Sequence, residues 1–259
     1  MPDSHCPPHA PDHAHDGETG YLHSVETGAA ADGPGMRFVF FLAGCPFRCL
    51  YCHNPDTWRF TSGRPVTLEE ALAEVRPYAG MLRRIGGVTV SGGEPLTQPA
   101  FAGRLLTALH DGLGLHTALD TQGFLGHKVD DAFLEKVDLV LLDVKHSDSD
   151  RHKALTGRPL ERTLEFARRL VALGKPLWIR HVVIPGWTDD DAHLARLADL
   201  LAGLGPLVER VDLLPYHRMG EFKWAELGRP FPLPDTPPAD PAQMAHAIDI
   251  LRSRGLPAV

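Results

Sequence analysis

Short β-rich runs alternate with helix-like segments along most of this chain, and this alternation constrains the fold more than any other feature. Strands are predicted at residues 37–43, 87–90, 115–119, 138–142, 177–183 and 210–214. Helices are predicted at residues 67–78, 98–113, 129–136, 161–173, 189–204 and 240–254. Repeated strand-then-helix units connect parallel strands through right-handed crossovers. Because six strands fall short of the eight in a complete TIM barrel, we predict an α/β fold with a parallel sheet in a partial (β/α)6 TIM-like barrel.

Two of the predicted helices begin with capping signals. Thr67 precedes the acidic pair Glu69 and Glu70, and Thr188 precedes three consecutive aspartates. A hydroxyl at the N-cap followed by acidic residues in the first turn satisfies the free amides and favours the helix dipole. The acidic run after Thr188 is therefore explained as a helix start.

Composition sets the domain organisation. The chain has 259 residues, of which 43% are hydrophobic and 23% charged, which is enough for a sizeable core. Residues 1–17 are rich in Pro, His and Asp and nearly devoid of apolar side chains, so we predict a disordered leader there. Cys6 and the leader histidines could bind a stray metal, but a solvated leader is the favoured interpretation. We expect one core domain at residues 18–259.

Charge and hydropathy limit the classes of partner. The formal net charge is -7 and no basic run stands out, which argues against binding to nucleic acid. No apolar stretch approaches about 18 residues, and the N-terminus lacks the basic and apolar regions of a secretory signal. We therefore expect a cytoplasmic protein that contacts neither nucleic acid nor membrane.

Three cysteines, Cys45, Cys49 and Cys52, fall within eight residues in a CxxxCxxC pattern. The cytosol keeps thiols reduced, so crowded cysteines indicate metal ligands there. Thiolates hold iron–sulfur clusters, and three of them leave one iron of a four-iron cluster open to a small molecule. A zinc site that adds His53 is the alternative. Zinc ligands usually come as two separated pairs, so the compressed spacing favours iron and sulfur.

Polar and glycine-rich residues follow each predicted strand. In parallel sheets and barrels, ligands bind at the carboxyl ends of the strands, so these residues predict a single site. Each also has a structural interpretation: a glycine turn, a helix cap, an internal ion pair or a hydrogen-bonded histidine. The residues singled out here are Gly93, Asp120, Asp143, Lys145 and His217. Arg180 lies inside the fifth predicted strand, where an inward guanidinium needs an anionic or carbonyl partner.

The cysteine pattern followed by Gly92-Gly93-Glu94 resembles the radical S-adenosylmethionine (SAM) superfamily. Within it, residues 19–259 resemble the family of pyruvate formate-lyase activating enzymes. The motifs that carry this resemblance are Asp32-Gly33-Pro34-Gly35, Tyr51 to Trp58, Asp120 to Phe124, Asp143-Val144-Lys145, Trp178-Ile179-Arg180, Val183 to Trp187, Leu214 to His217, and Met219-Gly220 with Lys223-Trp224.

The resemblance implies roles for specific residues. Cys45, Cys49 and Cys52 would hold a [4Fe–4S] cluster. The implied SAM-binding residues are Tyr51, Cys52, His53, Gly93, Asp143, Val144, Lys145 and His217. The implied ligands of a monovalent cation are Asp120, Thr121 and Asp143, and those expected to hold a glycine loop of a partner protein are Asp32 and Arg180.

The implied activity is that of an oxidoreductase that cleaves SAM reductively and removes a hydrogen atom from a glycine of pyruvate formate-lyase. A flavodoxin-like protein is the implied electron donor, and no catalytic acid or base is expected because the cofactors perform the chemistry. The chain lacks the cysteine-rich insert of many other activases, which favours this partner. The alternatives are an activase of another glycyl radical enzyme such as anaerobic ribonucleotide reductase, a small-molecule radical SAM enzyme, a ferredoxin, or a zinc-bound structural or binding protein.

Overall fold

The computed structural model describes residues 17–259, so almost all of the expected leader, with Cys6, lies outside the described residues. The described residues form two compact units. The first contains residues 17–46, 56–121 and 127–139, and the second contains residues 47–55, 122–126 and 140–259.

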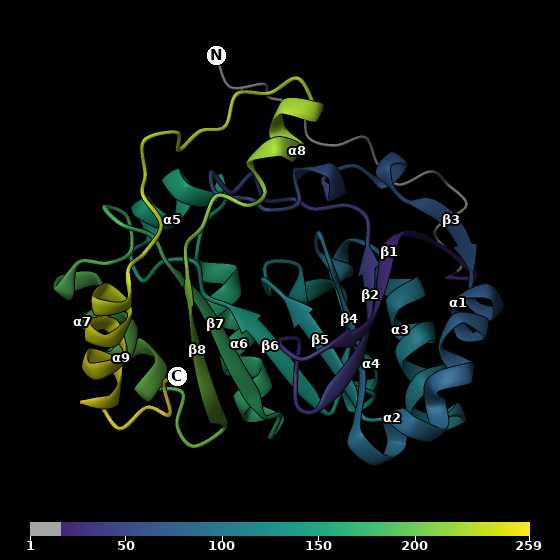
Figure 1. The fold of residues 1–259 in the computed structure, drawn as a ribbon. Helices are drawn as coiled ribbons and strands as arrows, with labels where there is room; N and C mark the ends of the chain where they lie inside the picture. The colour runs from purple at the N-terminus through teal and green to yellow at the C-terminus, as the bar shows by residue number, and fades with distance from the viewer. Residues whose placement is uncertain (1–16) are drawn as a thin grey trace. The chain divides into compact units, whose positions relative to one another are not determined.

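The first unit has a five-stranded sheet in the order β3-β1-β2-β4-β5 (Figure 1). Strand β1 pairs antiparallel with β2 and β3, whereas β2, β4 and β5 are parallel to one another. The elements are β1 (Thr19–Ala29), β2 (Met36–Leu42), β3 (Arg64–Thr67), α1 (Leu68–Val75), α2 (Ala79–Ile85), β4 (Gly86–Gly92), α3 (Pro99–Thr107), β5 (Thr117–Thr121) and α4 (Asp131–Glu135).

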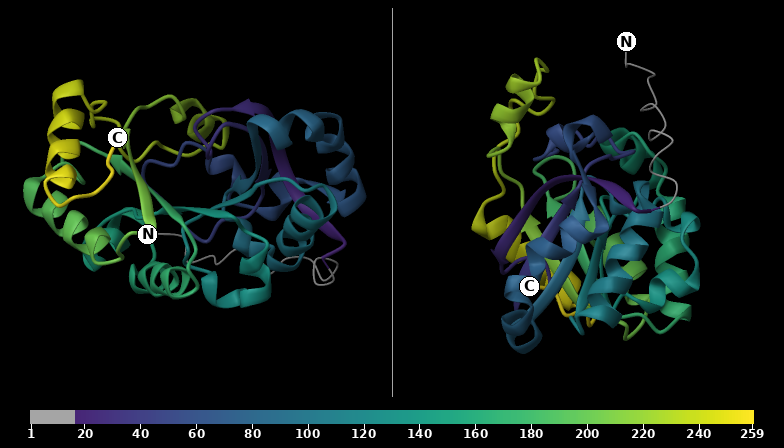
Figure 2. Two further views of the ribbon diagram at one scale, coloured as in Figure 1. Left: turned by 90° about the horizontal axis from the view of Figure 1, so that it is seen from below. Right: turned by 90° about the vertical axis from the view of Figure 1, so that its right-hand side faces the viewer.

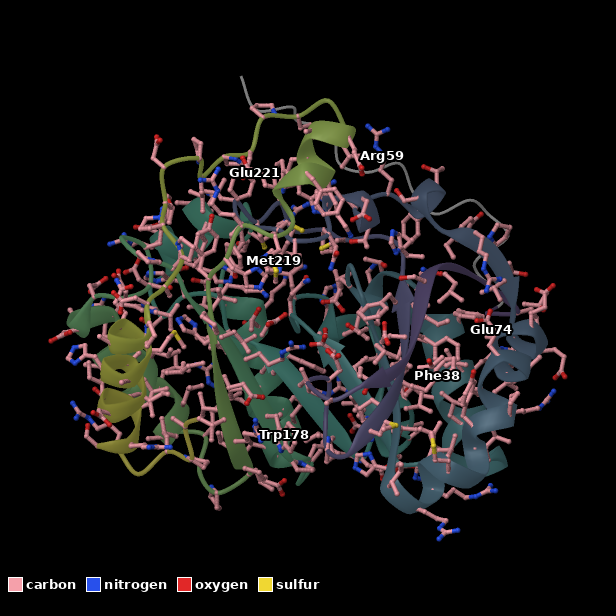
Figure 3. The ribbon with its side chains drawn as sticks, viewed as in Figure 1. Phe38, Arg59, Glu74, Trp178, Met219 and Glu221 are labelled. Atoms are coloured by element: carbon pink, nitrogen blue, oxygen red, sulfur yellow. The ribbon has the colours of Figure 1, made fainter. Side chains whose placement is uncertain are left out.

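The core of this unit is built on the apolar strands β2 and β4. The five central residues of β4 are all buried, as expected for a parallel strand that is covered on both faces. Phe38 and Phe40 on β2 are fully buried, and their ring centroids lie 4.9 Å apart (Phe38 is labelled in Figure 3). Full burial of such a side chain contributes about 1.5–3 kcal/mol to folding.

Helix α1 begins where the sequence predicts. The Thr67 hydroxyl accepts a hydrogen bond from the Glu70 amide at 3.2 Å, and the Thr67 amide donates to the Glu70 carboxylate at 2.8 Å. These reciprocal bonds form a capping box that satisfies two amides at the helix start. The predicted N-cap at Thr67 is therefore confirmed.

The second unit has three parallel strands in the order β6-β7-β8. Helices α7 and α9 pack side by side and appear in green and yellow in the left view of Figure 2. The elements are β6 (Leu139–Asp143), α5 (Ser149–Thr156), α6 (Glu161–Ala172), β7 (Leu177–Val183), α7 (Asp191–Ala202), β8 (Val208–Pro215), α8 (Glu221–Glu226) and α9 (Pro241–Arg252).

The structure corrects the predicted start of α7. The N-cap is Asp190, whose carboxylate accepts a hydrogen bond from the His193 amide at 2.9 Å. Thr188 instead donates to the Val182 carbonyl and accepts from the Ile184 amide, so its hydroxyl closes the turn that follows β7. The prediction failed because a threonine can cap a helix or close a turn, and its sequence neighbours are similar in both cases.

All six predicted strands are present, but β4, β5, β6 and β8 end one or two residues later than expected. Asp120 and Thr121 are the last residues of β5, and Asp143 is the last residue of β6. The antiparallel strands β1 and β3 and the helices α2, α5 and α8 were not predicted. Among residues 17–259, no helix is both long enough and apolar enough to cross a membrane.

Candidate functional site

In the first unit, the loop after β2 fixes the position of Cys45. The Gly44 amide donates to the Thr57 carbonyl at 2.7 Å, and the Cys45 amide donates to the Trp58 carbonyl at 3.2 Å. Gly44 has φ +97°, a conformation that side-chain-bearing residues rarely adopt. The Cys45 thiol is thereby held by backbone bonds on either side and is only 6% exposed.

The turn after β4 packs directly on this loop. The Gly93 amide donates to the Leu42 carbonyl at 2.9 Å. A Cβ added at Gly93 would lie 2.5 Å from the Gly44 carbonyl oxygen and 3.0 Å from the Cys45 Cβ. Only glycine therefore fits between the turn and the cysteine loop.

The carboxylate of Glu94 organises the same turn. Glu94 is fully buried and accepts hydrogen bonds from the Thr121 hydroxyl at 2.7 Å and from the Leu96 amide at 3.0 Å. The neighbouring Asp120 carboxylate accepts a hydrogen bond from the Ser91 hydroxyl at 2.7 Å. Asp120 and Thr121, two of the expected cation ligands, thus lie at the end of β5 beside the glycine turn.

In the second unit, helix α8 and the residues just before it cover the end of the cysteine motif. The Trp224 indole donates to the Cys52 carbonyl at 2.9 Å, and the Lys223 ammonium donates to the Asn54 side chain at 2.7 Å. A Cβ at Gly220 would lie 2.7 Å from the His53 Cα. Cys49 is buried and Cys52 half-buried. Figure 3 labels Met219 and Glu221 on the covering segment, where Met219 is 72% exposed.

Two histidines of this unit stack against each other. The ring centroids of His53 and His217 lie 4.2 Å apart. His53 Nε2 lies 2.9 Å from the His217 carbonyl oxygen, so Nε2 carries the proton and donates it. Burial, and next the neighbouring His53, lower the pKa of His217. The pair therefore presents a stacked aromatic surface.

Lys145, Asp143 and Tyr51 form a mostly buried polar group. The Lys145 ammonium lies 2.8 Å from the Asp143 carboxylate and 5.8 Å from the centroid of the Tyr51 ring. Burial alone lowers the pKa of Lys145, but Asp143, Tyr51 and Cys49 together outweigh it, and the pKa is raised. Lys145 is therefore a permanent cation at physiological pH.

The Tyr51 hydroxyl is buried, and no side chain or backbone group among the described residues forms a hydrogen bond with it. Burial raises the pKa of this hydroxyl, and Lys145 offsets only part of that increase. A buried hydroxyl without a hydrogen-bond partner costs about 1–3 kcal/mol, so this position is suited to a polar group of a ligand.

The two residues expected to contact a partner protein lie on separate elements. The Asp32 carbonyl accepts a hydrogen bond from the Thr89 hydroxyl at 2.6 Å, which anchors the turn before β2. Arg180 is half-buried on β7, in register with Asp143, and its carbonyl accepts a hydrogen bond from the Val144 amide at 3.1 Å.

Sequence reasoning missed two residues of this region. Trp224 reads in the sequence as a packing or surface residue, although a buried indole needs an acceptor and here finds the Cys52 carbonyl. Glu94 stands out in the sequence only as part of a glycine turn. Over residues 17–259, no three His, Cys, Asp or Glu side chains are grouped so that they could hold a metal ion.

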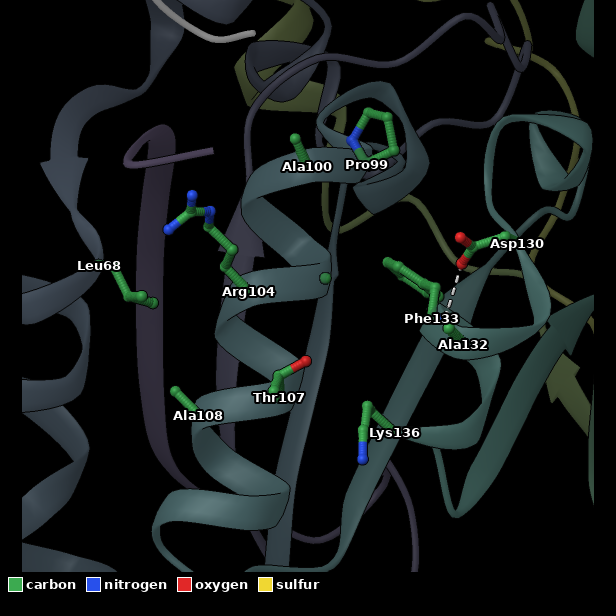
Figure 4. A pocket seen from close by; sticks show the side chains of 11 residues that line it. Leu68, Pro99, Ala100, Arg104, Thr107, Ala108, Asp130, Ala132, Phe133 and Lys136 are labelled. Atoms are coloured by element: carbon green, nitrogen blue, oxygen red, sulfur yellow. Dashed lines mark hydrogen bonds between the residues drawn. The ribbon is translucent and has the colours of Figure 1, made fainter. Parts of the chain in front are cut away.

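A pocket of about 590 Å³ lies elsewhere in the first unit (Figure 4). Gly103 on α3 and Phe133 and Lys136 around α4 are among its lining residues. Asp130, at the start of α4, accepts a hydrogen bond from the Phe133 amide at 2.9 Å, shown dashed in Figure 4. None of the residues expected to bind a cofactor lines this pocket.

Comparisons with known proteins define the class first. Residues 39–198 match the family model of the radical SAM superfamily. The structure resembles that of Streptococcus suis SuiB bound to its precursor peptide, with a TM-score of 0.65 at 16% identity over 85% of this chain and 47% of that one. At that identity the likeness concerns the fold alone.

The relatives narrow the family. The chain is 42% identical over 246 residues to a pyruvate formate-lyase-activating enzyme of Staphylococcus epidermidis, covering 91% of this chain and 96% of that protein. The Staphylococcus aureus enzyme of the same name is 41% identical over 244 residues with the same coverage. A crystal structure of a domain of the Bacteroides vulgatus enzyme matches with a TM-score of 0.56 at 30% identity, over 67% of this chain and 98% of that domain.

The chain belongs to the radical SAM superfamily and, within it, to the family of the pyruvate formate-lyase-activating enzymes. This confirms the resemblance seen in the sequence, the predicted α/β fold class, and the prediction that the protein is an enzyme. Membership implies a [4Fe–4S] cluster and SAM as cofactors.

Proposed function

We propose that this enzyme cleaves SAM reductively and removes a hydrogen atom from the α-carbon of one glycine in pyruvate formate-lyase, which leaves a glycyl radical on that protein. The observation that carries the proposal is the match to activating enzymes over 91% of the chain and 96% of the relative. A match of that extent spans nearly the whole length of both proteins.

The chemistry of the cysteine motif fits an iron–sulfur cluster, although its three thiols are not grouped around one point in the described residues. Cys45, Cys49 and Cys52 supply three thiol ligands from eight consecutive residues, two of them buried, and thiolates are the ligands that such clusters require. Three protein ligands leave one iron available to SAM. The Cys52 carbonyl is held by Trp224, so the end of the motif is already fixed in place.

The SAM-binding roles follow from the chemistry of each group. The glycine turn at Gly93, which packs against Cys45, would contact the methionine part, and the Lys145 ammonium can pair with its carboxylate. The stacked rings of His53 and His217 offer aromatic surface to the adenine, and the buried Tyr51 hydroxyl can accept or donate one hydrogen bond. The remaining proposed contacts are Cys52, Asp143 and Val144.

When bound, the cofactors would supply the chemistry: the cluster would provide one electron for the cleavage of SAM to methionine and a 5′-deoxyadenosyl radical, and that radical would take the glycine hydrogen atom. The protein binds and orients SAM and keeps water from the site. We propose that Asp32 and Arg180 hold the glycine loop of the partner. Asp120, Thr121 and Asp143 would bind a monovalent cation, and a flavodoxin-like protein would supply electrons.

The test combines three measurements on protein purified and reconstituted without oxygen. We expect bound iron and sulfide, 5′-deoxyadenosine on reduction with SAM, and a glycyl EPR doublet after mixing with pyruvate formate-lyase. Cys49→Ala should abolish all three, and Cys6→Ala serves as the matched cysteine control. A colourless zinc protein would overturn the cofactor assignment. A doublet obtained only with another glycyl radical enzyme, such as anaerobic ribonucleotide reductase, would overturn the partner.

A further inference from the structure

Three fully buried histidines lie beside the strand end that carries Asp143 and Lys145, and the proposed reaction does not use them. His181 lies on β7, His193 lies in the first turn of α7, and His146 follows β6. The ring centroids of His193 and His181 are 5.1 Å apart and those of His193 and His146 are 4.0 Å apart. Buried imidazoles need hydrogen-bond partners, and the partners of these rings form a connected series of hydrogen bonds.

The hydrogen-bond partners of His181 and His193 favour one proton position on each ring. His181 Nδ1 lies 2.6 Å from the Val144 carbonyl oxygen, which can only accept, so Nδ1 carries the proton. His193 Nδ1 faces the Ser147 amide at 3.5 Å, which can only donate, so His193 carries its proton on Nε2. The two Nε2 atoms lie 3.2 Å apart, and the proton on His193 points at the bare nitrogen of His181. Both rings are therefore neutral.

Both ends of this series of hydrogen bonds return to one short segment. The Val144 carbonyl bonds to His181, His181 bonds to His193, and His193 Nδ1 lies 2.8 Å from the Ser147 hydroxyl. Val144 and Ser147 both belong to the segment 144–147. The Val144 amide is held as well, by the Arg180 carbonyl at 3.1 Å. Lys145 lies between the two anchored ends, so its backbone position is fixed from both sides.

Neighbouring groups also fix the positions of His146 and His193. The His146 ring stacks on His193. Its Nδ1 accepts a hydrogen bond from the Asp148 amide at 2.9 Å, and its Nε2 lies 3.2 Å from the Trp187 carbonyl oxygen. The His193 amide is bound by Asp190, so the second ring is fixed to the first turn of α7. The two rings that bind residues 144–147 are therefore held by different elements, His181 by β7 and His193 by α7. Packing alone would not require this set of hydrogen bonds.

We infer that the hydrogen-bonded relay Val144–His181–His193–Ser147 is a positioning device that sets Lys145 and Asp143 for SAM. The inference rests on the proposed function, because it takes Lys145 as a SAM contact. The histidines act through the segment and do not touch SAM themselves. Loss of the Val144 hydrogen bond should therefore weaken the binding of SAM while leaving the chemical step largely unchanged, because the relay holds a residue that binds SAM and none of its members touches the reacting atoms.

The test uses the reconstituted holoenzyme and two variants of His181. His181→Leu removes the donor to Val144, whereas His181→Asn retains an N–H near the position of Nδ1. We expect the dissociation constant and KM for SAM to rise about tenfold in His181→Leu with kcat within about twofold, and His181→Asn to restore most of the affinity. The exposed His246→Asn is the control and should bind SAM like the wild type.

A second measurement keeps the inference testable if His181→Leu fails to fold. Nitrogen NMR of the histidine rings in the diamagnetic oxidised holoenzyme should show the proton on Nδ1 of His181 and on Nε2 of His193. Ser147→Ala should fold and weaken SAM binding about threefold. Unchanged SAM affinity in these variants, or the opposite tautomers, would overturn the inference alone. A wild-type enzyme that does not bind SAM would overturn the proposed function and the inference with it.

Discussion

The buried histidines make the free energy of unfolding fall in mild acid. Burial lowers the pKa of His181 to about 4, although the hydrogen bond to the Val144 carbonyl opposes part of this decrease. Burial, and next His181 and His146, lower the pKa of His193 to about 2. An unfolded histidine titrates near 6.5. Above pH 6.5 both states are neutral and stability is unaffected. Below it only the unfolded chain takes up the protons, so stability is lost as the pH falls toward the folded pKa.

The magnitude follows from these values. At pH 5.0 an unfolded imidazole of pKa about 6.5 is stabilised by protonation by about 2 kcal/mol, and the folded ring gains almost nothing. His181 and His193 together should therefore lower the free energy of unfolding by about 4 kcal/mol between pH 7.5 and pH 5.0. That is a large share of the roughly 5–15 kcal/mol that stabilises a typical domain.

Urea unfolding of the cluster-free chain at several pH values measures this effect. Trp178, Trp187 and Trp224 lie in the second unit, as do the histidines, so tryptophan fluorescence reports mainly on that unit. His193→Asn should be about 1–3 kcal/mol less stable at pH 7.5, because it breaks the relay. Between pH 7.5 and 5.0 the free energy of unfolding of His193→Asn should fall by about 2 kcal/mol less than that of the wild type. The variant lacks one of the two histidines that take up a proton only in the unfolded chain.

The exposed His246→Asn is the control for this experiment and should follow the pH dependence of the wild type. Parallel curves for the wild type and His193→Asn would refute the reasoning, because they would mean that His193 takes up its proton in the folded protein as readily as in the unfolded one.

Three further predictions concern the cofactor sites. Gly93→Ala places a methyl group 2.5 Å from the Gly44 carbonyl oxygen, so we expect about 1–3 kcal/mol of destabilisation by thermal unfolding and weaker SAM binding by equilibrium titration; unchanged affinity would contradict the close approach at this turn. Trp224→Phe keeps the ring but loses the bond to the Cys52 carbonyl, and should cost about 1 kcal/mol and speed the loss of iron in air, followed by absorbance; an unchanged rate would show that this bond does not secure the motif. Lys145→Met removes the cation proposed to bind the SAM carboxylate and should raise the dissociation constant for SAM at least tenfold with iron content unchanged, whereas equal affinity would remove Lys145 from the site.

Much of the fold was predictable because the parallel strands carry strong local signals. Strands β2 and β6 contain continuous apolar runs, and a helix-like segment follows each predicted strand, so the existence and order of the strands can be read from the chain alone. Strands β1 and β3 escaped prediction because their residues are partly exposed and partly polar, and they are stable only through pairing with each other and with β2. The start of α7 was misplaced because Thr188 and Asp190 are equally good caps in sequence terms.

The candidate site divides in the same way. The spacing of Cys45, Cys49 and Cys52, with the glycine turn some forty residues later, is by itself enough to indicate an iron–sulfur cluster and SAM. Such motifs are visible because the chemistry requires particular residue types at fixed spacing. Their protein ligands come from short, continuous stretches of chain.

Only the tertiary structure could connect Trp224 with Cys52 or join His181 and His193 into a relay with the segment around Lys145. These partners are separated by 172, 12 and 37 residues, and nothing in the local sequence of an indole or an imidazole says which carbonyl or nitrogen it will meet. The sequence by itself determined the class of fold and the cofactor chemistry, because both depend on local patterns. Folding decided how the binding residues are held, because a buried hydrogen bond depends on which distant groups the packed core brings within about 3 Å.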